Sequence, residues 1–185
     1  MKKTALISIL LALILSLSSC HLTVSRLPLP DLDDPSHAHD ADETLDALDT
    51  GTEKTFSKAG ITLRLSDKFR EVESQRGFDA YYTSDFCGVV VLKESFSKEE
   101  GLAEKSLEAY IKDVIENNGH KNIEPQNLDG LWFYVNYNKS SYRCVYSYSY
   151  KGADAFYIVQ YIMNRKDEAV LKDVIHNWAK DTVVS

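Results

Sequence analysis

Three strand-like runs in the second half of the chain constrain the fold most strongly. These runs, rich in β-branched and aromatic residues, occupy Leu131–Asn136, Tyr142–Tyr150 and Ala155–Met163. The polar connections Asn138–Ser141 and Lys151–Asp154 separate them. Connections this short join antiparallel neighbours, because a parallel pair needs a crossover of a dozen or more residues. The three runs therefore predict an antiparallel meander.

Three further strands are expected earlier in the chain. Ile61–Leu65 alternates apolar and polar residues after a turn at Gly60, which is typical of a half-buried strand. The runs Phe78–Thr83 and Gly88–Lys93 flank the polar pair Ser84-Asp85, which indicates a hairpin. We therefore expect a sheet of about six strands.

Two amphipathic helices complete the predicted domain. Ser97 and Glu100 have the spacing of a capping box and predict the start of a helix that stops at Asn117–Gly119. A closing helix is expected from about Asp167 to Thr182. The expected buried stripes are Leu107, Tyr110, Ile111, Val114 and Ile115 in the first helix, and Leu171, Val174, Ile175 and Trp178 in the second. A mainly antiparallel sheet with both helices packed on it buries both stripes, so the fold class is α+β.

The order of elements over residues 56–183 resembles a known family. The resemblance is carried by the first strand at Gly60–Leu63, the helix at Leu107–Tyr110 and a last helix that ends at Trp178-Ala179. This layout resembles the PsbP-like fold, an α/β/α sandwich shared by the photosystem subunit PsbP, the DcrB-type bacterial lipoproteins and a yeast Ran-binding protein. The resemblance implies a non-catalytic accessory or binding role and no particular partner, because fold does not determine function.

The beginning of the chain has the pattern of an export signal. Lys2 and Lys3 precede a run without charge from Thr4 to Leu17. That run has about the length of a signal-peptide core and is shorter than the roughly 20 apolar residues of a spanning helix. It ends in Leu17-Ser18-Ser19-Cys20.

These four residues resemble the bacterial lipoprotein box. The resemblance implies cleavage between Ser19 and Cys20 and attachment of a diacylglyceryl group to the Cys20 thiol. Two acyl chains on one residue hold a protein stably at a membrane. We therefore expect residues 1–19 to be a lipoprotein signal peptide. The mature protein should then be lipid-anchored on the extracytoplasmic side of the cell membrane, or of an outer membrane where the cell has one.

An acidic segment separates the anchor from the domain. Residues 21–54 contain nine acidic residues against Arg26 and Lys54, three prolines and no aromatic residue. Such a composition favours a flexible tether over residues 20–54 and a folded domain over residues 55–185. His37 and His39 lie among aspartates and could ligate zinc or nickel. No second cluster accompanies them, so we expect a solvated tether, no metal and no cofactor.

Charge excludes nucleic acid as a partner class. The chain has a formal charge of −7, and residues 55–185 contain 19 acidic and 17 basic residues. Nucleic-acid binding requires clustered lysines and arginines that neutralise phosphates, and no such stripe occurs.

Two cysteines remain in the expected domain. A bridge between Cys87 and Cys144 would close a loop of about 58 residues and stabilise the fold by roughly 4 kcal/mol in the chain-entropy estimate. Disulfides persist in exported proteins. Alternatively, each cysteine is a small buried apolar side chain.

Tyrosine is unusually frequent, with eleven in the chain. Tyr146 and Tyr148 share one face of their strand, and Tyr134 and Tyr137 come from the adjacent run. These four form a candidate binding face, because tyrosine combines apolar area with a polar tip. The alternative is that they form the core beneath a helix.

The sequence carries no catalytic signature. It lacks a Gly-x-Ser-x-Gly elbow, a glycine-rich phosphate loop and paired-cysteine metal spacing, and the domain histidines His120 and His176 have no motif around them. We therefore expect a membrane-anchored, non-enzymatic binding or accessory module for an unidentified protein or small molecule. The alternatives are a hydrolase acting on envelope material and a small-ligand carrier that uses the tyrosine-rich face.

Overall fold

The computed structural model describes residues 52–73, 77–139 and 142–185. The predictions of a signal peptide, of cleavage between Ser19 and Cys20, of a lipid on Cys20 and of an acidic tether fall outside the described residues. Within the described part of the chain, neither helix has the length and apolar character needed to cross a bilayer.

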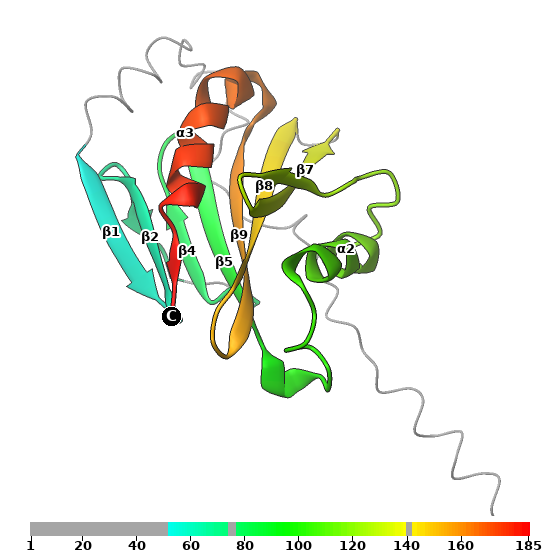
Figure 1. Cartoon of the computed structure of the whole chain (residues 1–185). Helices are drawn as coiled ribbons and strands as arrows, with labels where there is room; N and C mark the ends of the chain where they lie inside the picture. The colour runs from blue at the N-terminus through cyan, green and yellow to red at the C-terminus, as the bar shows by residue number, and fades with distance from the viewer. Residues whose placement is uncertain (1–51, 74–76, 140–141) are drawn as a thin grey trace, which may run out of the picture.

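The described residues form two antiparallel sheets and two α-helices (Figure 1). The large sheet has seven strands in the order β3-β4-β5-β9-β8-β7-β6. Its strands are β3 (Arg70–Glu71), β4 (Ala80–Thr83), β5 (Cys87–Ser95), β6 (Gln126–Leu128), β7 (Leu131–Asn138), β8 (Arg143–Lys151) and β9 (Ala155–Asn164). The small sheet consists of β1 (Glu53–Lys58), β2 (Ile61–Ser66) and β10 (Val183–Val184), with β2 in the middle. The helices are α2 (Leu107–Asn117) and α3 (Glu168–Lys180).

The α+β class and the antiparallel meander are confirmed. β7, β8 and β9 pair in sequence, and β5 adds to the far side of β9. The expectation of about six strands in one sheet is corrected to seven in the large sheet, with β2 in a second sheet. The strands that sequence missed in the described residues are β3, β6 and β10, each two or three residues long, and β1, whose single buried side chain is Phe56. Such strands show no apolar alternation.

The folded part begins slightly earlier than predicted. β1 starts at Glu53 and pairs with β2 from the register Glu53–Ser66 to Lys58–Ile61. Glu53 and Lys54, which we assigned to the tether, therefore belong to the small sheet.

The start of the first helix also differs from the prediction. α2 begins at Leu107, and the Oγ of Ser106 accepts a hydrogen bond from the Ala109 backbone N–H at 3.1 Å. Ser97 instead lies in the short 3-10 turn η3 (Phe96–Lys98). Gly101 has a φ of +82°, which interrupts helical geometry between the two candidate caps. A capping-box spacing is thus present without the helix that it usually begins.

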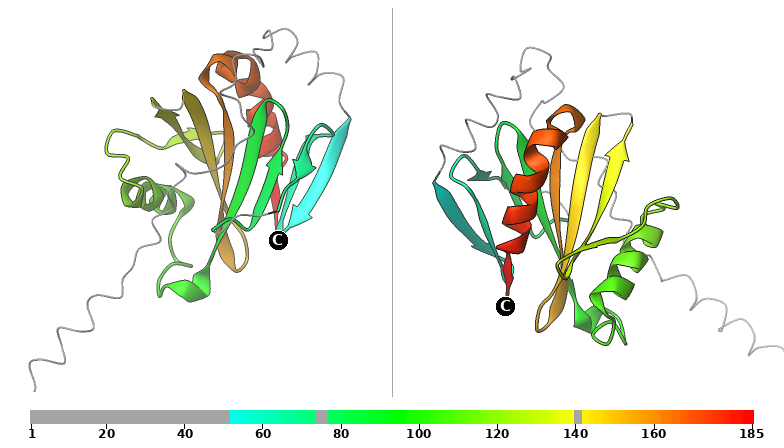
Figure 2. Two further views of the ribbon diagram at one scale, coloured as in Figure 1. Left: turned by 180° about the vertical axis from the view of Figure 1, so that it is seen from behind. Right: turned by 45° about the horizontal axis from the view of Figure 1, so that its top comes forward.

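The two helices cover opposite faces of the large sheet. In the right-hand view of Figure 2, α3 and α2 lie on either side of β9 and β8. Residues along β8 alternate accordingly: Tyr146 and Tyr148 join the main core under α3, whereas Ser147 and Ser149 have the opposite parity and point to the side of α2. We call the α2 side of the large sheet its back face.

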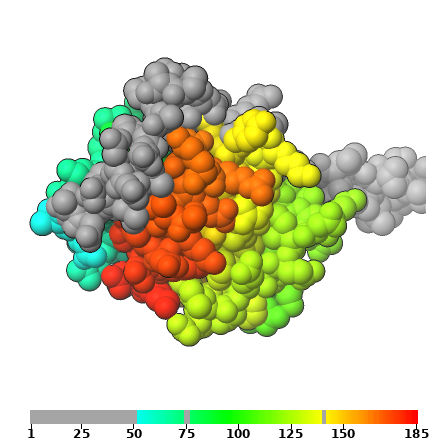
Figure 3. Space-filling view, turned by 90° about the horizontal axis from the view of Figure 1, so that it is seen from above, coloured from blue at the N-terminus to red at the C-terminus, as the bar shows by residue number. Residues whose placement is uncertain are grey.

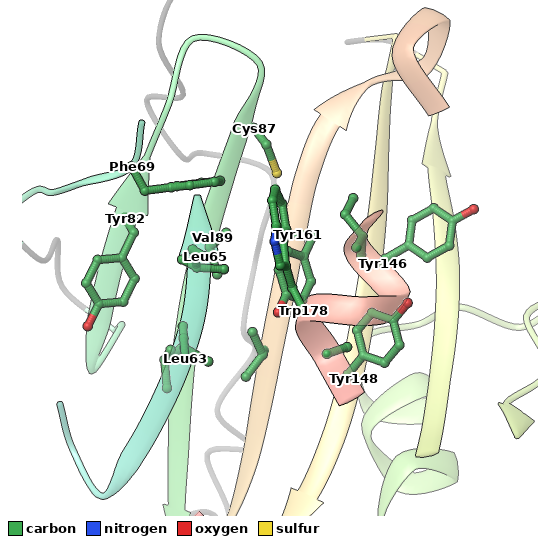
Figure 4. Close-up of a cluster of buried hydrophobic side chains, with 14 of the residues drawn as sticks. Leu63, Leu65, Phe69, Tyr82, Cys87, Val89, Tyr146, Tyr148, Tyr161 and Trp178 are labelled. Atoms are coloured by element: carbon green, nitrogen blue, oxygen red, sulfur yellow. The ribbon is translucent and has the colours of Figure 1, made fainter. Parts of the chain in front are cut away.

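The main core lies between the large sheet, α3 and the small sheet (Figure 4). Trp178 of α3 stacks on Tyr161 of β9, with ring centroids 6.3 Å apart, and meets the Phe69 ring edge-on at 5.4 Å. Leu63 and Leu65 of β2 are fully buried in the same cluster. The apolar stripe predicted for the last helix is therefore the one that α3 buries.

Candidate functional site

The predicted tyrosine face is not a surface. Tyr146 and Tyr148 are 3% and 0% exposed beneath α3. Tyr134 is 2% exposed on the back face, where it packs with Ile111 of α2. Only Tyr137, at 44%, is exposed among the four. The prediction of a binding face is therefore wrong for Tyr134, Tyr146 and Tyr148, which belong to the core instead. The alternation of residues along a strand does not reveal which face of the sheet a helix covers.

Two of these tyrosines converge on one carboxylate. The hydroxyls of Tyr137 and Tyr146 both donate to the Oε1 of Glu168, at 2.7 and 2.8 Å. The hydrogen bond to Glu168, followed by burial, raises the pKa of Tyr137 to about 12. The Arg165 guanidinium lies 5.0 Å from the centre of the Tyr137 ring. The cluster joins the start of α3 to strands β7 and β8. Figure 3 shows the orange surface of α3 beside the yellow surface of β8.

The two cysteines are free and buried. Each pairs with Met163, Cys87 from β5 and Cys144 from β8, so β9 lies between them. Two strand spacings separate their Cα atoms by about 9.5 Å, beyond the roughly 7 Å limit for a disulfide. The predicted bridge is therefore wrong, and the alternative of two buried apolar side chains applies. Burial raises the pKa of each thiol to about 12, so both are protonated and neither is an activated nucleophile.

His176 is a buried member of the aromatic core. Its Nδ1 lies 2.5 Å from the Tyr148 hydroxyl, and the ring meets Phe133 and Tyr146 edge-on. Burial, together with the nearby Lys172, holds the pKa of His176 below its usual value. The ring is therefore neutral near pH 7.

His120 lies on the other side of the large sheet. Its Nε2 is 3.4 Å from the Asn136 side-chain nitrogen, and its ring faces Tyr134 at 6.0 Å. Burial also lowers the pKa of His120. Because the sheet separates His120 from His176, the two histidines cannot act in one site.

An open cavity of about 320 Å³ lies at the small sheet, between the β1–β2 hairpin and β10. Its lining residues are Ser57, Lys58, Gly60, Ile61, Thr62, Val183 and Ser185. The Lys58 ammonium is paired with Glu71. Among the residues that the structure describes, no group of three or more His, Cys, Asp or Glu side chains could hold a metal ion.

The back face carries a small apolar cluster that sequence reasoning missed. We call it the back-face cluster; it consists of Tyr81, Val90, Val145 and Ile162. These residues come from β4, β5, β8 and β9, so four neighbouring strands contribute one side chain each. The sequence already places Val145 on the opposite face of its strand from the tyrosines of β8. Only the strand order shows that Val145 lies beside Tyr81, Val90 and Ile162.

A comparison with solved structures identifies the fold. Cyanobacterial PsbP (CyanoP) from Synechocystis sp. PCC 6803 aligns with a TM-score of 0.51 at 12% identity, covering 73% of this chain and 94% of that one. The domain has a PsbP-like fold. At this identity the likeness concerns the fold alone.

Two further likenesses are weaker. The Ran-binding protein Mog1p of Saccharomyces cerevisiae has a TM-score of 0.47 at 11% identity, covering 73% of this chain and 96% of that one. LpqN of Mycobacterium tuberculosis, described as involved in cell envelope biogenesis, has a TM-score of 0.43 at 14% identity, covering 74% and 92%. Neither carries a functional argument at such scores. No family model matches the sequence, and no curated protein matches it.

Proposed function

We propose that the chain is a lipid-anchored, extracytoplasmic accessory protein whose PsbP-like domain binds a partner without catalysing a reaction. The observation that carries the proposal is Leu17-Ser18-Ser19-Cys20, which follows two lysines and an uncharged run. A thiol at that position is the acceptor that lipidation requires, and two acyl chains suffice for stable anchoring.

The chemistry of the domain supports the non-catalytic part of the proposal. Catalytic groups need pKa values matched to proton transfer or nucleophilic attack. In this domain the raised pKa keeps the Cys87 and Cys144 thiols protonated, and His176 is engaged by the Tyr148 hydroxyl inside the core. The tyrosine-rich face is filled by α3, which removes the basis for the small-ligand carrier alternative.

Fractionation of the producing cells tests the proposal. The protein should sediment with membranes, resist a high-salt wash and dissolve in mild detergent, because its attachment is hydrophobic rather than ionic. Protease added to spheroplasts should degrade the domain while a cytoplasmic marker survives. Recovery of the protein in the cytoplasmic fraction would overturn the proposal. So would resistance of the domain to protease in intact spheroplasts, if the domain is degraded once detergent has opened them.

A further inference from the structure

Exposed aromatic and basic side chains gather at one end of the large sheet. Nine of the eleven tyrosines are buried, and the two exposed ones are Tyr137 at 44% and Tyr142 at 76%. Lys139 follows β7, and Arg165 and Lys166 follow β9; all three are exposed. We call these five residues the hairpin-end patch. The core does not use the Tyr142 ring, because most of its surface is open to solvent.

The backbone holds Tyr142 in an uncommon conformation. Its φ of +51° lies in the left-handed region, which bulky residues rarely adopt. The Tyr142 carbonyl accepts a hydrogen bond from the Arg165 backbone N–H at 2.9 Å, and the Arg165 guanidinium lies 5.0 Å from the centre of the Tyr137 ring. These contacts hold Tyr142 against the turn before α3. Strained residues held in this way cluster at binding sites, so the strain supports a binding role for this end of the sheet.

The charge at this end is positive, although the whole chain carries −7. Residues 137–143 and 164–168 contain four basic and two acidic side chains, and three of the four basic ones are exposed. Of the two acids, Asp167 is buried, and Glu168 accepts hydrogen bonds from two tyrosine hydroxyls. The exposed acid of the β4–β5 turn, Asp85, lies two strands away from β8. The outward charges of the patch are therefore basic.

The described part of the chain begins at the same end of the molecule. The Thr52 carbonyl accepts a hydrogen bond from the Asp67 backbone N–H at 2.8 Å, and Phe69 packs edge-on against Phe86, which immediately precedes β5. Register places the start of β5 in one row with the end of β9, the start of β8 and Tyr137 of β7. The starts of β1, β8 and α3 accordingly all lie in the upper half of Figure 1. A membrane anchor that precedes Thr52 would thus be joined to the end that carries the patch.

We propose that the hairpin-end patch binds anionic phospholipid headgroups on the surface of the membrane that holds the anchor. This inference rests on the lipid anchor proposed above and adds an orientation to it. Tyrosine favours the interface between bilayer and water, where its ring is partly buried and its hydroxyl stays hydrated. Basic side chains are attracted to anionic lipids within a Debye length of the surface. An acidic protein surface would match the charge equally well, but the entry of the chain at this end favours the membrane.

Chemical labelling of Tyr142 in nanodiscs tests the proposal. The whole exported chain is inserted into nanodiscs of phosphatidylcholine, and into nanodiscs in which phosphatidylglycerol replaces about a third of that lipid. N-acetylimidazole, a water-soluble reagent, acetylates exposed tyrosine, and peptide mass spectrometry follows the reaction at Tyr142. Acetylation should be at least about fivefold slower in the anionic nanodiscs, because headgroup contact shields the hydroxyl. High salt should remove the difference, because it screens the attraction.

Two pairs of lysine substitutions assign the effect to the patch. Lys139→Gln together with Lys166→Gln should give equal acetylation rates in the two kinds of nanodisc. The matched control is Lys98→Gln together with Lys121→Gln, two exposed lysines before and after α2. This control should keep the difference between the two lipids. All four side chains are exposed, so these substitutions should leave the fold intact.

The outcomes separate this inference from the proposed anchor. A chain that carries no lipid by intact mass and does not co-elute with nanodiscs would overturn both. A chain that co-elutes but shows equal Tyr142 acetylation in both lipids would overturn the patch alone. So would a difference that persists in Lys139→Gln with Lys166→Gln. Equal rates in the two lipids, with slower acetylation only in intact cells, would assign the patch to a protein partner instead.

Discussion

At the scale of single residues, polar side chains tie α3 to the large sheet. The hydroxyls of Tyr137 and Tyr146 share Glu168, and the Tyr148 hydroxyl is paired with His176. Buried polar atoms cost free energy unless they are paired, so the contacts of Tyr146 and Tyr148, whose side chains are buried, favour one position of the helix on the sheet. The sequence pattern indicates strands for these tyrosines but does not indicate their partners, Glu168 and His176, which lie 22 to 31 residues further along the chain.

The burial of His176 makes stability depend on pH. Because burial lowers the pKa of His176, the unfolded state binds more protons than the folded state once the pH falls below about 6.5. The free energy of unfolding should therefore decrease as the pH drops from 7 to 5.5. His176→Phe should cost about 1–3 kcal/mol at pH 7, since it leaves the Tyr148 hydroxyl unpaired, and should flatten this slope. Urea denaturation at several pH values measures both; equal slopes for the two proteins would contradict the assignment.

The Glu168 contact predicts a spectroscopic change. Glu168→Gln removes the carboxylate that stabilises the neutral phenol, so the pKa of Tyr137 should fall from about 12 toward its ordinary value of about 10. Ultraviolet titration detects ionised tyrosine, and the difference from a Tyr137→Phe protein isolates the signal of this residue. A Tyr137 pKa that does not change in Glu168→Gln would show that the hydrogen bond is not its cause.

At the scale of elements, local patterns located most strands and both helices but chose the wrong cap. Ser97 and Ser106 are both possible caps in the sequence. The choice between them depends on Gly101, whose positive φ bends the chain away from helical geometry, so the helix begins only after Ser106. The short strands β3, β6 and β10 arise from pairing with longer neighbours. Their two or three residues contain too little pattern for any sequence-based prediction.

Helix α2 offers a matched pair of substitutions. Ser106→Ala removes the hydrogen bond to the Ala109 N–H and should destabilise the domain by about 1 kcal/mol. Ser97→Ala, at the cap that the sequence pattern indicated, should change stability by less than about 0.5 kcal/mol because Ser97 is exposed. Chemical denaturation compares the two. A larger loss for Ser97→Ala would place the start of the helix where the sequence pattern put it.

The β1–β2 hairpin offers another pair. Gly60 has a φ of +90°, and a Cβ there would lie 2.5 Å from the Tyr157 hydroxyl oxygen. Gly101 has a φ of +82° with nothing within 4 Å of such a Cβ. Both Gly→Ala substitutions incur backbone strain of about 1 kcal/mol, but Gly60→Ala should cost at least about 1 kcal/mol more because Tyr157 must move. If thermal unfolding shows equal losses of stability for the two variants, the Tyr157 side chain can move away at little cost in free energy.

At the scale of the whole molecule, strand order is what sequence could not provide. The meander β7-β8-β9 follows from short connections, whereas the pairing of β5 with β9 joins segments about 70 residues apart. That pairing puts β9 between Cys87 and Cys144, which excludes the bridge, and assembles the back-face cluster from four strands. The α+β class and the main core were predictable because they depend on apolar stripes within single elements.

The most direct test of the central claim is metabolic labelling of the producing cells with an alkyne fatty acid. The unsubstituted protein and a Cys87→Ala control should both incorporate the label, because each keeps the thiol of Cys20. Cys20→Ala should incorporate none and should retain its first 19 residues, which intact mass measures. Equal labelling of Cys20→Ala and the unsubstituted protein, or no labelling of either, would contradict the account of this chain as a lipid-anchored accessory protein.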